Sequence, residues 1–263
     1  MATTGLDAPG RAQVGVRTLR TDNWWLQPAF TALVLIGFVV YAGWRVFSGV
    51  SYYAAPYISV FYSPGLAANC VPGTSDVTLV GSWWTLSPAL LTAWVPLAFR
   101  MTCYYYRKAY YRSFWLSPPA CAVGETHKSY TGERRFPLII NNAHRWFFYL
   151  GLLFNIVLTY DALLAFRNPQ GEWGHMGLGT IFLAGNAALL WMYSLSCHSC
   201  RHAIGGRLTH FSKHPLRYKF WTWTSRLNGH HPRWAWASLA SVVVADFYVY
   251  LLATGTITDL RFF

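Results

Sequence analysis

The sequence predicts an all-α membrane protein, a bundle of five transmembrane helices with a cytoplasmic N-terminus. Of its 263 residues, 54% are hydrophobic and only 11% are charged, whereas charged residues make up roughly 25% of a soluble domain. Aromatic residues reach 18%, as expected where Trp and Tyr rings lie at membrane–water interfaces. Several uncharged runs also approach or exceed the roughly 20 residues that one span needs.

Each uncharged run supports one expected helix. A polar arm, residues 1–22, precedes the first helix and lacks the apolar stretch of a cleavable signal. Residues 48–80 contain three prolines and scattered glycines and are expected to form a turn-rich loop. Residues 23–263 are expected to be one transmembrane domain. The five expected helices cover residues 28–47, 83–106, 144–166, 174–200 and 234–254.

The distribution of basic residues predicts the orientation. The N-terminal arm has three Lys or Arg, and the segments 107–145 and 201–233 have seven each, while the opposite loops and the C-terminus have only Arg45, Arg167 and Arg261. Five spans place all the dense basic segments on one face, which the positive-inside rule makes cytoplasmic. The net charge of +12 therefore reflects topology and contact with lipid rather than nucleic-acid binding.

Two thiols and two imidazoles lie within Ser196–His202, where the fourth expected helix ends and a basic segment begins. Soft metal ligands at such a depth are costly to keep unless they bind something. The expected topology brings further ligands to the same membrane surface. The set that gathers there is Cys103, Cys121, His144, Cys197, His198, Cys200 and His202.

Two thiolates and two imidazoles are the ligand set of a Rieske-type [2Fe–2S] centre. His198 and His202 are four residues apart and would share one helix face. We expect Cys103 and Cys121 to bind one iron and His144 and His198 to bind the other. Cys197 and His202 are the nearest substitutes for these ligands. Of the two, we include His202, and the expected metal-site residues are Cys103, Cys121, His144, His198 and His202.

Two other kinds of site remain open. Haem b needs axial histidines on facing helices and no thiolate, and His144 and His198 could supply them. A tetrahedral zinc site in a non-redox scaffold is the third option. For a single residue, a cysteine in a span can also be an apolar filler, and a histidine at a helix end can cap carbonyls. We favour that second interpretation for His230 and His231.

Four segments resemble the membrane-anchor subunit of the actinobacterial type of succinate dehydrogenase, a branch of respiratory complex II. They are residues 102–112, 118–125, 142–145 and 196–202. The resemblance extends from about residue 30 to the end, and its Cys and His segments are the most specific part. It departs from familiar anchors of this enzyme, which carry haem b between span histidines or no cofactor.

The resemblance implies partners and a location. The partners would be a flavoprotein that oxidises succinate and an iron–sulfur subunit that relays electrons, both bound at the cytoplasmic face of a bacterial plasma membrane. The anchor would pass the electrons to menaquinone, in a pocket whose residues stay undefined. A higher oligomer of the complex stays open. The chain has no flavin fingerprint, so it would belong to the enzyme as a subunit without a catalytic flavin site.

Overall fold

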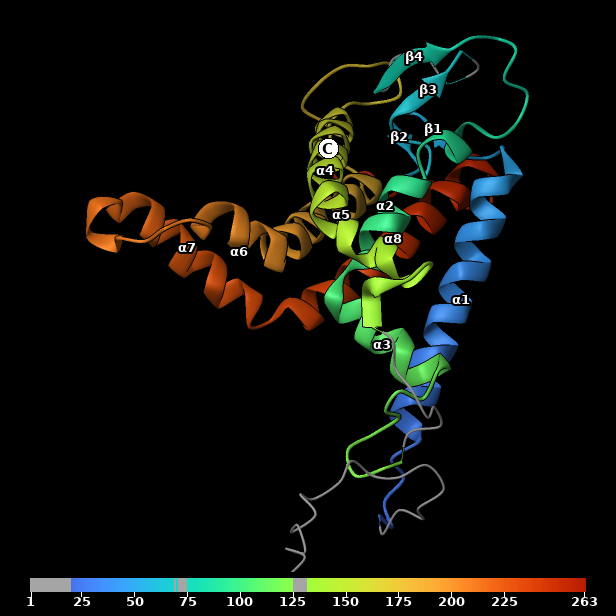
Figure 1. Ribbon diagram of the computed structural model, residues 1–263. Coiled ribbons are helices and arrows are strands. Elements are labelled where there is room, and N and C mark those ends of the chain that lie inside the picture. The colour runs from blue at the N-terminus through green and yellow to red at the C-terminus, as the bar shows by residue number, and fades with distance from the viewer. Residues whose placement is uncertain (1–19, 69, 71–74, 125–131) are drawn as a thin grey trace, which may run out of the picture.

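The computed structural model describes residues 20–68, 70, 75–124 and 132–263, and it is mostly helical (Figure 1). Most of the expected arm, residues 1–19, lies outside the described residues. Within the described residues, four helices are long and apolar enough to cross a membrane. They are α1 (Leu26–Ser48), α4 (His144–Leu164), α5 (Leu178–Leu195) and α8 (His231–Ala253). The 3₁₀ turns η2 (Gly132–Arg134) and η3 (Leu138–Ala143) precede α4.

The expected helix over residues 83–106 is not one continuous span. It consists of η1 (Pro88–Leu91), α2 (Trp94–Thr102) and α3 (Tyr104–Phe114). The break between the last two is at Cys103, whose backbone is extended. Just before it, the Thr102 hydroxyl donates to the Ala98 carbonyl at 2.7 Å, a contact that tends to bend helices. Apart from Arg100, the residues on both sides of the break are uncharged as far as Tyr106, so hydropathy alone predicted a longer helix.

The expected fourth helix is also interrupted. α5 ends at Leu195, Cys197 is extended, and a new helix, α6 (His198–Gly205), begins directly after it. The basic segment expected to be a loop contains η4 (Phe211–Lys213) and α7 (Pro215–Asn228). α6 and α7 pack against each other and form an arm that projects from the side of the bundle (Figure 1).

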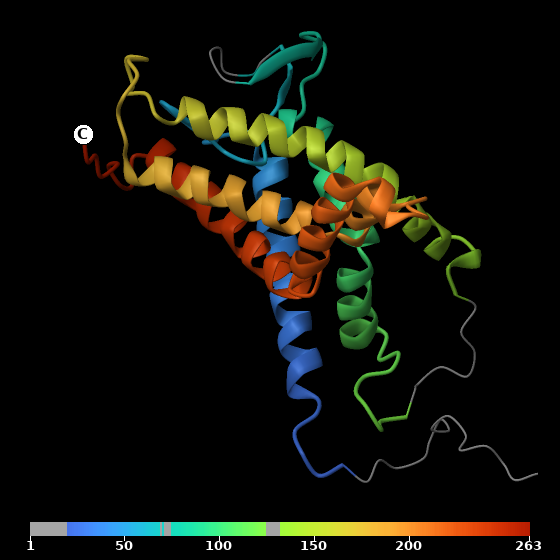
Figure 2. The ribbon, with the colours of Figure 1, turned by 90° about the vertical axis from the view of Figure 1, so that its left-hand side faces the viewer.

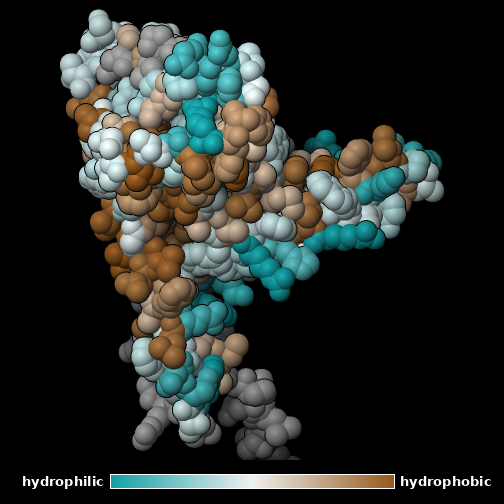
Figure 3. All heavy atoms as spheres, turned by 180° about the vertical axis from the view of Figure 1, so that it is seen from behind, coloured by the Kyte–Doolittle hydropathy of each residue, from teal (hydrophilic) through white to brown (hydrophobic). Residues whose placement is uncertain are grey.

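The core of the bundle is formed by α4, α5 and α8. α5 packs along both of the others, and the three run side by side in Figure 2. α1 crosses them steeply and contacts α3 and α8. Large apolar side chains on α1 stay exposed, and Figure 3 shows hydrophobic residues over the flank where this helix lies. Apolar patches of this kind are typical of membrane or partner contact.

The described part of the loop after α1 contains short strands and no span, as predicted. β1 (Tyr53–Ala54) pairs antiparallel with β2 (Tyr57–Ile58), and β3 (Gly65–Ala67) pairs parallel with β4 (Asp76–Val80). Beside them lies a buried ion-pair cluster, by which we mean Arg45, Asp246, Tyr41 and Ser59. The Asp246 carboxylate accepts from Arg45 Nε at 2.8 Å, from the Tyr41 hydroxyl at 2.5 Å and from Ser59.

Candidate metal centre

Four helices begin at one end of the bundle, and each begins with or directly after a soft metal ligand. Cys103 precedes α3 and Cys197 precedes α6, while His144 and His231 are the first residues of α4 and α8. We call these four side chains the sulfur–imidazole cluster. The N-terminus of a helix carries a partial positive charge. Four such ends together favour a bound group of negative charge.

The four side chains are in contact in two pairs. The Nε2 atom of His231 lies 3.3 Å from Cys103 Sγ. The Nε2 atom of His144 lies 3.1 Å from Cys197 Sγ. Three of the four are almost fully buried, with exposed fractions of 2% for Cys103, 1% for Cys197 and 7% for His231. The two Cys–His pairs therefore lie in a largely buried part of the bundle, in which His144 is half-buried.

Hydroxyl groups hold both imidazole rings in place. Thr102 Oγ1 lies 2.9 Å from His144 Nδ1, and Ser196 Oγ lies 2.8 Å from His231 Nδ1. Each hydroxyl belongs to the residue directly before a cysteine of the cluster, so each break between helices supplies one thiol and one hydroxyl. A hydrogen bond at one ring nitrogen fixes the tautomer and aims the other nitrogen. Both Nε2 atoms are thus directed at sulfur.

Aromatic rings cover the cluster. Phe99 stacks on the His144 ring at 5.2 Å and 14°, and Tyr193 stacks on the His231 ring at 5.1 Å and 15°. The Tyr193 ring lies 5.3 Å from that of Phe99. Its hydroxyl is buried and has no hydrogen-bond partner among the described residues. Rings of this size keep the surroundings of the sulfur atoms apolar.

The charge next to the cluster is positive. Arg100 is buried and donates to the Tyr106 hydroxyl at 2.7 Å and to Ser238 Oγ at 3.1 Å. It forms no ion pair with a carboxylate within the described ranges, and its guanidinium lies 4.8 Å from the centre of the Tyr193 ring. A buried cation without a counter-ion is costly. A negatively charged group in the cluster would provide one.

The free thiol of Cys197 is held in its neutral form. Burial raises its pKa to about 12, and the nearby Cys103 adds to the rise. The Ser199 amide donates to Cys197 Sγ at 3.4 Å, which works in the opposite direction. A thiolate here would need a cation close by, and a metal ion displaces the thiol proton on binding.

The donor set, two Cys and two His, has the composition of the ligands of a binuclear iron–sulfur group. In a Rieske-type centre each iron takes only two protein ligands, two Cys on one and two His on the other. In this structure each thiol contacts one imidazole, and no group of three or more His, Cys, Asp or Glu side chains within the described ranges is placed to hold a metal ion.

Two of the expected ligands, Cys103 and His144, belong to the cluster, and three do not. Cys121 is exposed in the loop after α3, where its carbonyl accepts from Arg20 Nη1 at 2.8 Å. His198 is exposed at the start of α6. His202 is exposed one turn later, and Arg145 Nη2 lies 3.0 Å from its Nδ1.

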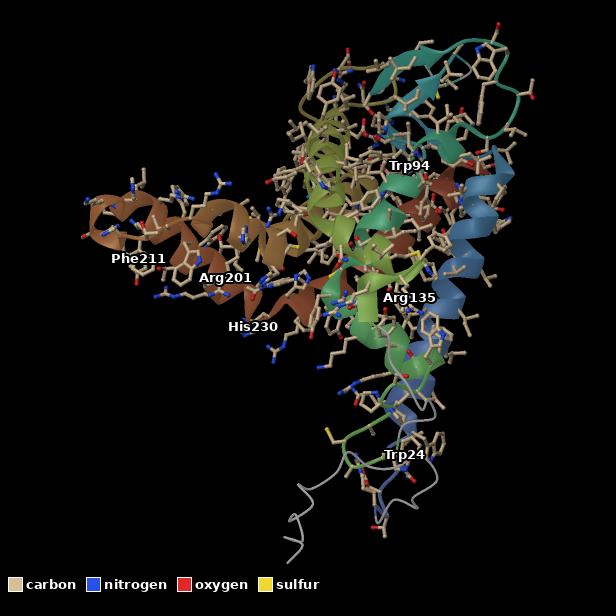
Figure 4. All side chains as sticks on the ribbon, viewed as in Figure 1. Trp24, Trp94, Arg135, Arg201, Phe211 and His230 are labelled. Atoms are coloured by element: carbon tan, nitrogen blue, oxygen red, sulfur yellow. The ribbon has the colours of Figure 1, made fainter. Side chains whose placement is uncertain are left out.

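The structure adds Cys197, which the sequence offered as a substitute, and His231, which the sequence assigned to a helix end. His231 was expected in the loop before a helix starting at residue 234, yet α8 begins at His231 itself. Pro232 in the first turn is the signal that could have located this start. Figure 4 shows the neighbouring His230 at the turn between α7 and α8, with Arg201 and Phe211 farther along the arm.

Comparisons with known proteins agree with this architecture. The family described as actinobacterial succinate dehydrogenase subunit SdhC matches residues 26–255. A solved chain from the Mycobacterium smegmatis Sdh1 complex in the apo form is 53% identical, with a TM-score of 0.87, covering 99% of this chain and 100% of that one. No curated protein sequence matches. The chain therefore belongs to the actinobacterial SdhC family of succinate dehydrogenase membrane subunits.

Proposed function

We propose that this membrane subunit carries electrons from a soluble iron–sulfur subunit of succinate dehydrogenase to menaquinone, through a Rieske-type [2Fe–2S] cluster. Cys103 and Cys197 would bind one iron, and His144 and His231 the other. The observation that carries the proposal is the pairing of two buried thiols with two imidazoles, at 3.1 and 3.3 Å, where four helices begin. When bound, such a cluster supplies one-electron transfer at a potential raised by its neutral imidazole ligands.

The chain's own residues would prepare the site. Thr102 and Ser196 orient the imidazoles, and the four helix starts favour negative charge. Arg100 adds a full positive charge within the same buried core. Phe99 and Tyr193 exclude water from the rings they cover. The positive charge of Arg100 would favour the reduced state, in which the centre is more negative.

The partners follow from family membership. The soluble flavoprotein and iron–sulfur subunits would dock at the face where the sulfur–imidazole cluster lies, because electrons must reach it from the soluble side. The basic segments 107–145 and 201–233 begin or end at this face, and the positive-inside rule makes it cytoplasmic in a bacterial plasma membrane. With that orientation, the ion-pair cluster lies at the outer side.

Menaquinone would bind beside α6. A hollow of about 140 Å³ is lined by His198, Arg201, His202, Gly205, Gly206 and Trp221. Its two imidazoles can donate hydrogen bonds to quinone carbonyls, and the Trp221 indole, which Arg201 covers at 4.9 Å, forms one wall of the hollow. His198 precedes Ser199 and follows Cys197, so a headgroup here would be next to the cluster. This gives His198 and His202 a role in place of metal binding.

The proposal is tested on the intact complex by iron and acid-labile sulfide analysis with EPR spectroscopy. The double variant His144→Ala/His231→Ala should lose a Rieske-like signal and quinone reduction, and it should keep succinate oxidation by an artificial acceptor. The matched control, His198→Ala/His202→Ala, should keep the signal and raise the KM for quinone. Unchanged quinone reduction in the first variant contradicts the site. A haem Soret band, or zinc without iron, would support one of the two rival centres.

A further inference from the structure

The buried hydroxyl of Tyr193 is not explained by packing. The side chain is 1% exposed, and its oxygen has no hydrogen-bond partner among the described residues. A buried polar group without a partner costs free energy. A phenylalanine would fill the same space without that cost, as Phe99 and Phe148 do in the same core.

Tyr106 provides the internal comparison. It lies in the same core, with its ring 6.1 Å from that of Tyr193. Its hydroxyl donates to the Ala235 carbonyl at 2.7 Å and accepts from Arg100 at 2.7 Å. Two buried tyrosines side by side thus differ in one respect. Among the described residues, the hydroxyl of Tyr106 has hydrogen-bond partners and that of Tyr193 has none.

The position of Tyr193 indicates what its hydroxyl could meet. The ring stacks on His231, whose Nε2 contacts Cys103 Sγ. Cys103, Cys197 and Tyr193 pack in one buried core, from which bulk water is absent. A group bound by the sulfur–imidazole cluster would bring thiolate and sulfide sulfurs into this space. Such sulfurs accept hydrogen bonds, and these bonds help to set the reduction potential of the centre.

We infer that the Tyr193 hydroxyl donates a hydrogen bond to a sulfur atom of the bound iron–sulfur centre and thereby raises its reduction potential. The inference rests on the proposed function. Reduction adds one electron to the centre and makes its sulfurs more negative, so a hydrogen bond to them is stronger in the reduced state. Tyr193 is therefore a positioning residue that favours electron uptake from the soluble subunit, and it is not a ligand.

The test is Tyr193→Phe in the intact complex, with Tyr106→Phe as the matched control. EPR-monitored redox titration should show that Tyr193→Phe keeps the signal and lowers the midpoint potential. Loss of one hydrogen bond to a charged group makes reduction about tenfold less favourable, or about 59 mV for one electron. Tyr106→Phe should shift the potential less. It should lower the thermal midpoint more, because it removes one hydrogen bond to the Ala235 carbonyl and one from the Arg100 guanidinium.

Pulsed EPR adds an independent measurement. An exchangeable proton coupled to the centre should be seen in the unmodified complex and should disappear in Tyr193→Phe. An unchanged potential with the proton still present would overturn the inference and leave the proposed function intact. Loss of the centre in Tyr193→Phe would also overturn it, because the hydroxyl would then be needed for assembly. If the unmodified complex has no iron–sulfur signal, the proposed function itself fails.

Discussion

The two ends of α8 carry two buried polar groupings of opposite character. In the ion-pair cluster, Asp246 accepts from three donors, and Arg45 also donates to the carbonyls of Val50 and Ser51 at 3.3 and 3.1 Å. Both charges are fully buried and compensate each other. Every strong donor there faces an acceptor. Such a closed network joins α1, α8 and the loop after α1, and it leaves no room for a further ligand.

In the sulfur–imidazole cluster, by comparison, the hydrogen-bonding and charged groups are only partly paired. Its sulfur contacts are weak hydrogen bonds, the Tyr193 hydroxyl lacks a partner, and Arg100 lacks a carboxylate within the described ranges. A polar network that is only partly satisfied destabilises a fold unless something completes it. In a chain with so few charges, a network whose donors and acceptors are all paired indicates a structural role, and an incomplete one indicates a place for a bound group.

The largest expected effect is the loss of iron from the sulfur–imidazole cluster when one of its cysteines is replaced. We expect Cys197→Ser to lose most iron and sulfide from the membrane subunit, because a hydroxyl does not replace a thiolate as a ligand of this type of centre. The complex should still assemble, since the side-chain volume barely changes. Metal analysis and EPR of the purified complex measure this. Full iron content in the variant would mean that Cys197 does not bind iron.

Disrupting the ion-pair cluster should instead lower the stability of the folded subunit. Asp246→Asn leaves the Arg45 charge buried and uncompensated, and we expect it to destabilise the subunit by about 3–5 kcal/mol. Thermal unfolding in detergent measures the loss. The iron content per assembled complex should stay unchanged, because the cluster lies at the other end of the helix. Selective loss of iron without a change in stability would reverse the assignment of roles.

Replacing both members of the ion pair should cost less than replacing one. In Arg45→Met/Asp246→Leu no charge is left buried, and swaps of this kind are often neutral. We therefore expect the double variant to be more stable than Asp246→Asn by about 2 kcal/mol or more. If it is the less stable of the two in the same thermal assay, the hydrogen bonds from Tyr41 and Ser59 to Asp246 matter more for stability than the buried charge of Arg45.

The smallest effect should come from the hydroxyl groups that orient the imidazoles. Ser196→Ala removes the partner of His231 Nδ1, and loss of such a partner typically weakens metal binding by about 10–100-fold. We expect partial iron occupancy that added iron and sulfide restore. Ser241→Ala in the same helix as His231 is the control, since Ser241 donates to Asn186 at 2.9 Å. Equal iron content in both variants would argue against an orienting role.

Much of this architecture could be predicted from the sequence, because long uncharged runs and sparse charge dictate the four long helices. The breaks at Cys103 and Cys197 could not, since hydropathy does not change where the backbone becomes extended. These breaks decide which thiols turn inward. His231 was missed for a related reason, because its basic neighbours hid the start of α8. Cys121 and His198 were expected to join the cluster, but both are exposed and lie outside its two Cys–His contacts.

The most direct test compares the unmodified complex with Cys197→Ser by iron and sulfide analysis. The account predicts that the unmodified complex holds about two iron and two sulfide per membrane subunit beyond those of its soluble subunits, as a [2Fe–2S] centre requires. The variant should lack this excess. Equal iron and sulfide in both proteins, with equal rates of quinone reduction, would contradict the account.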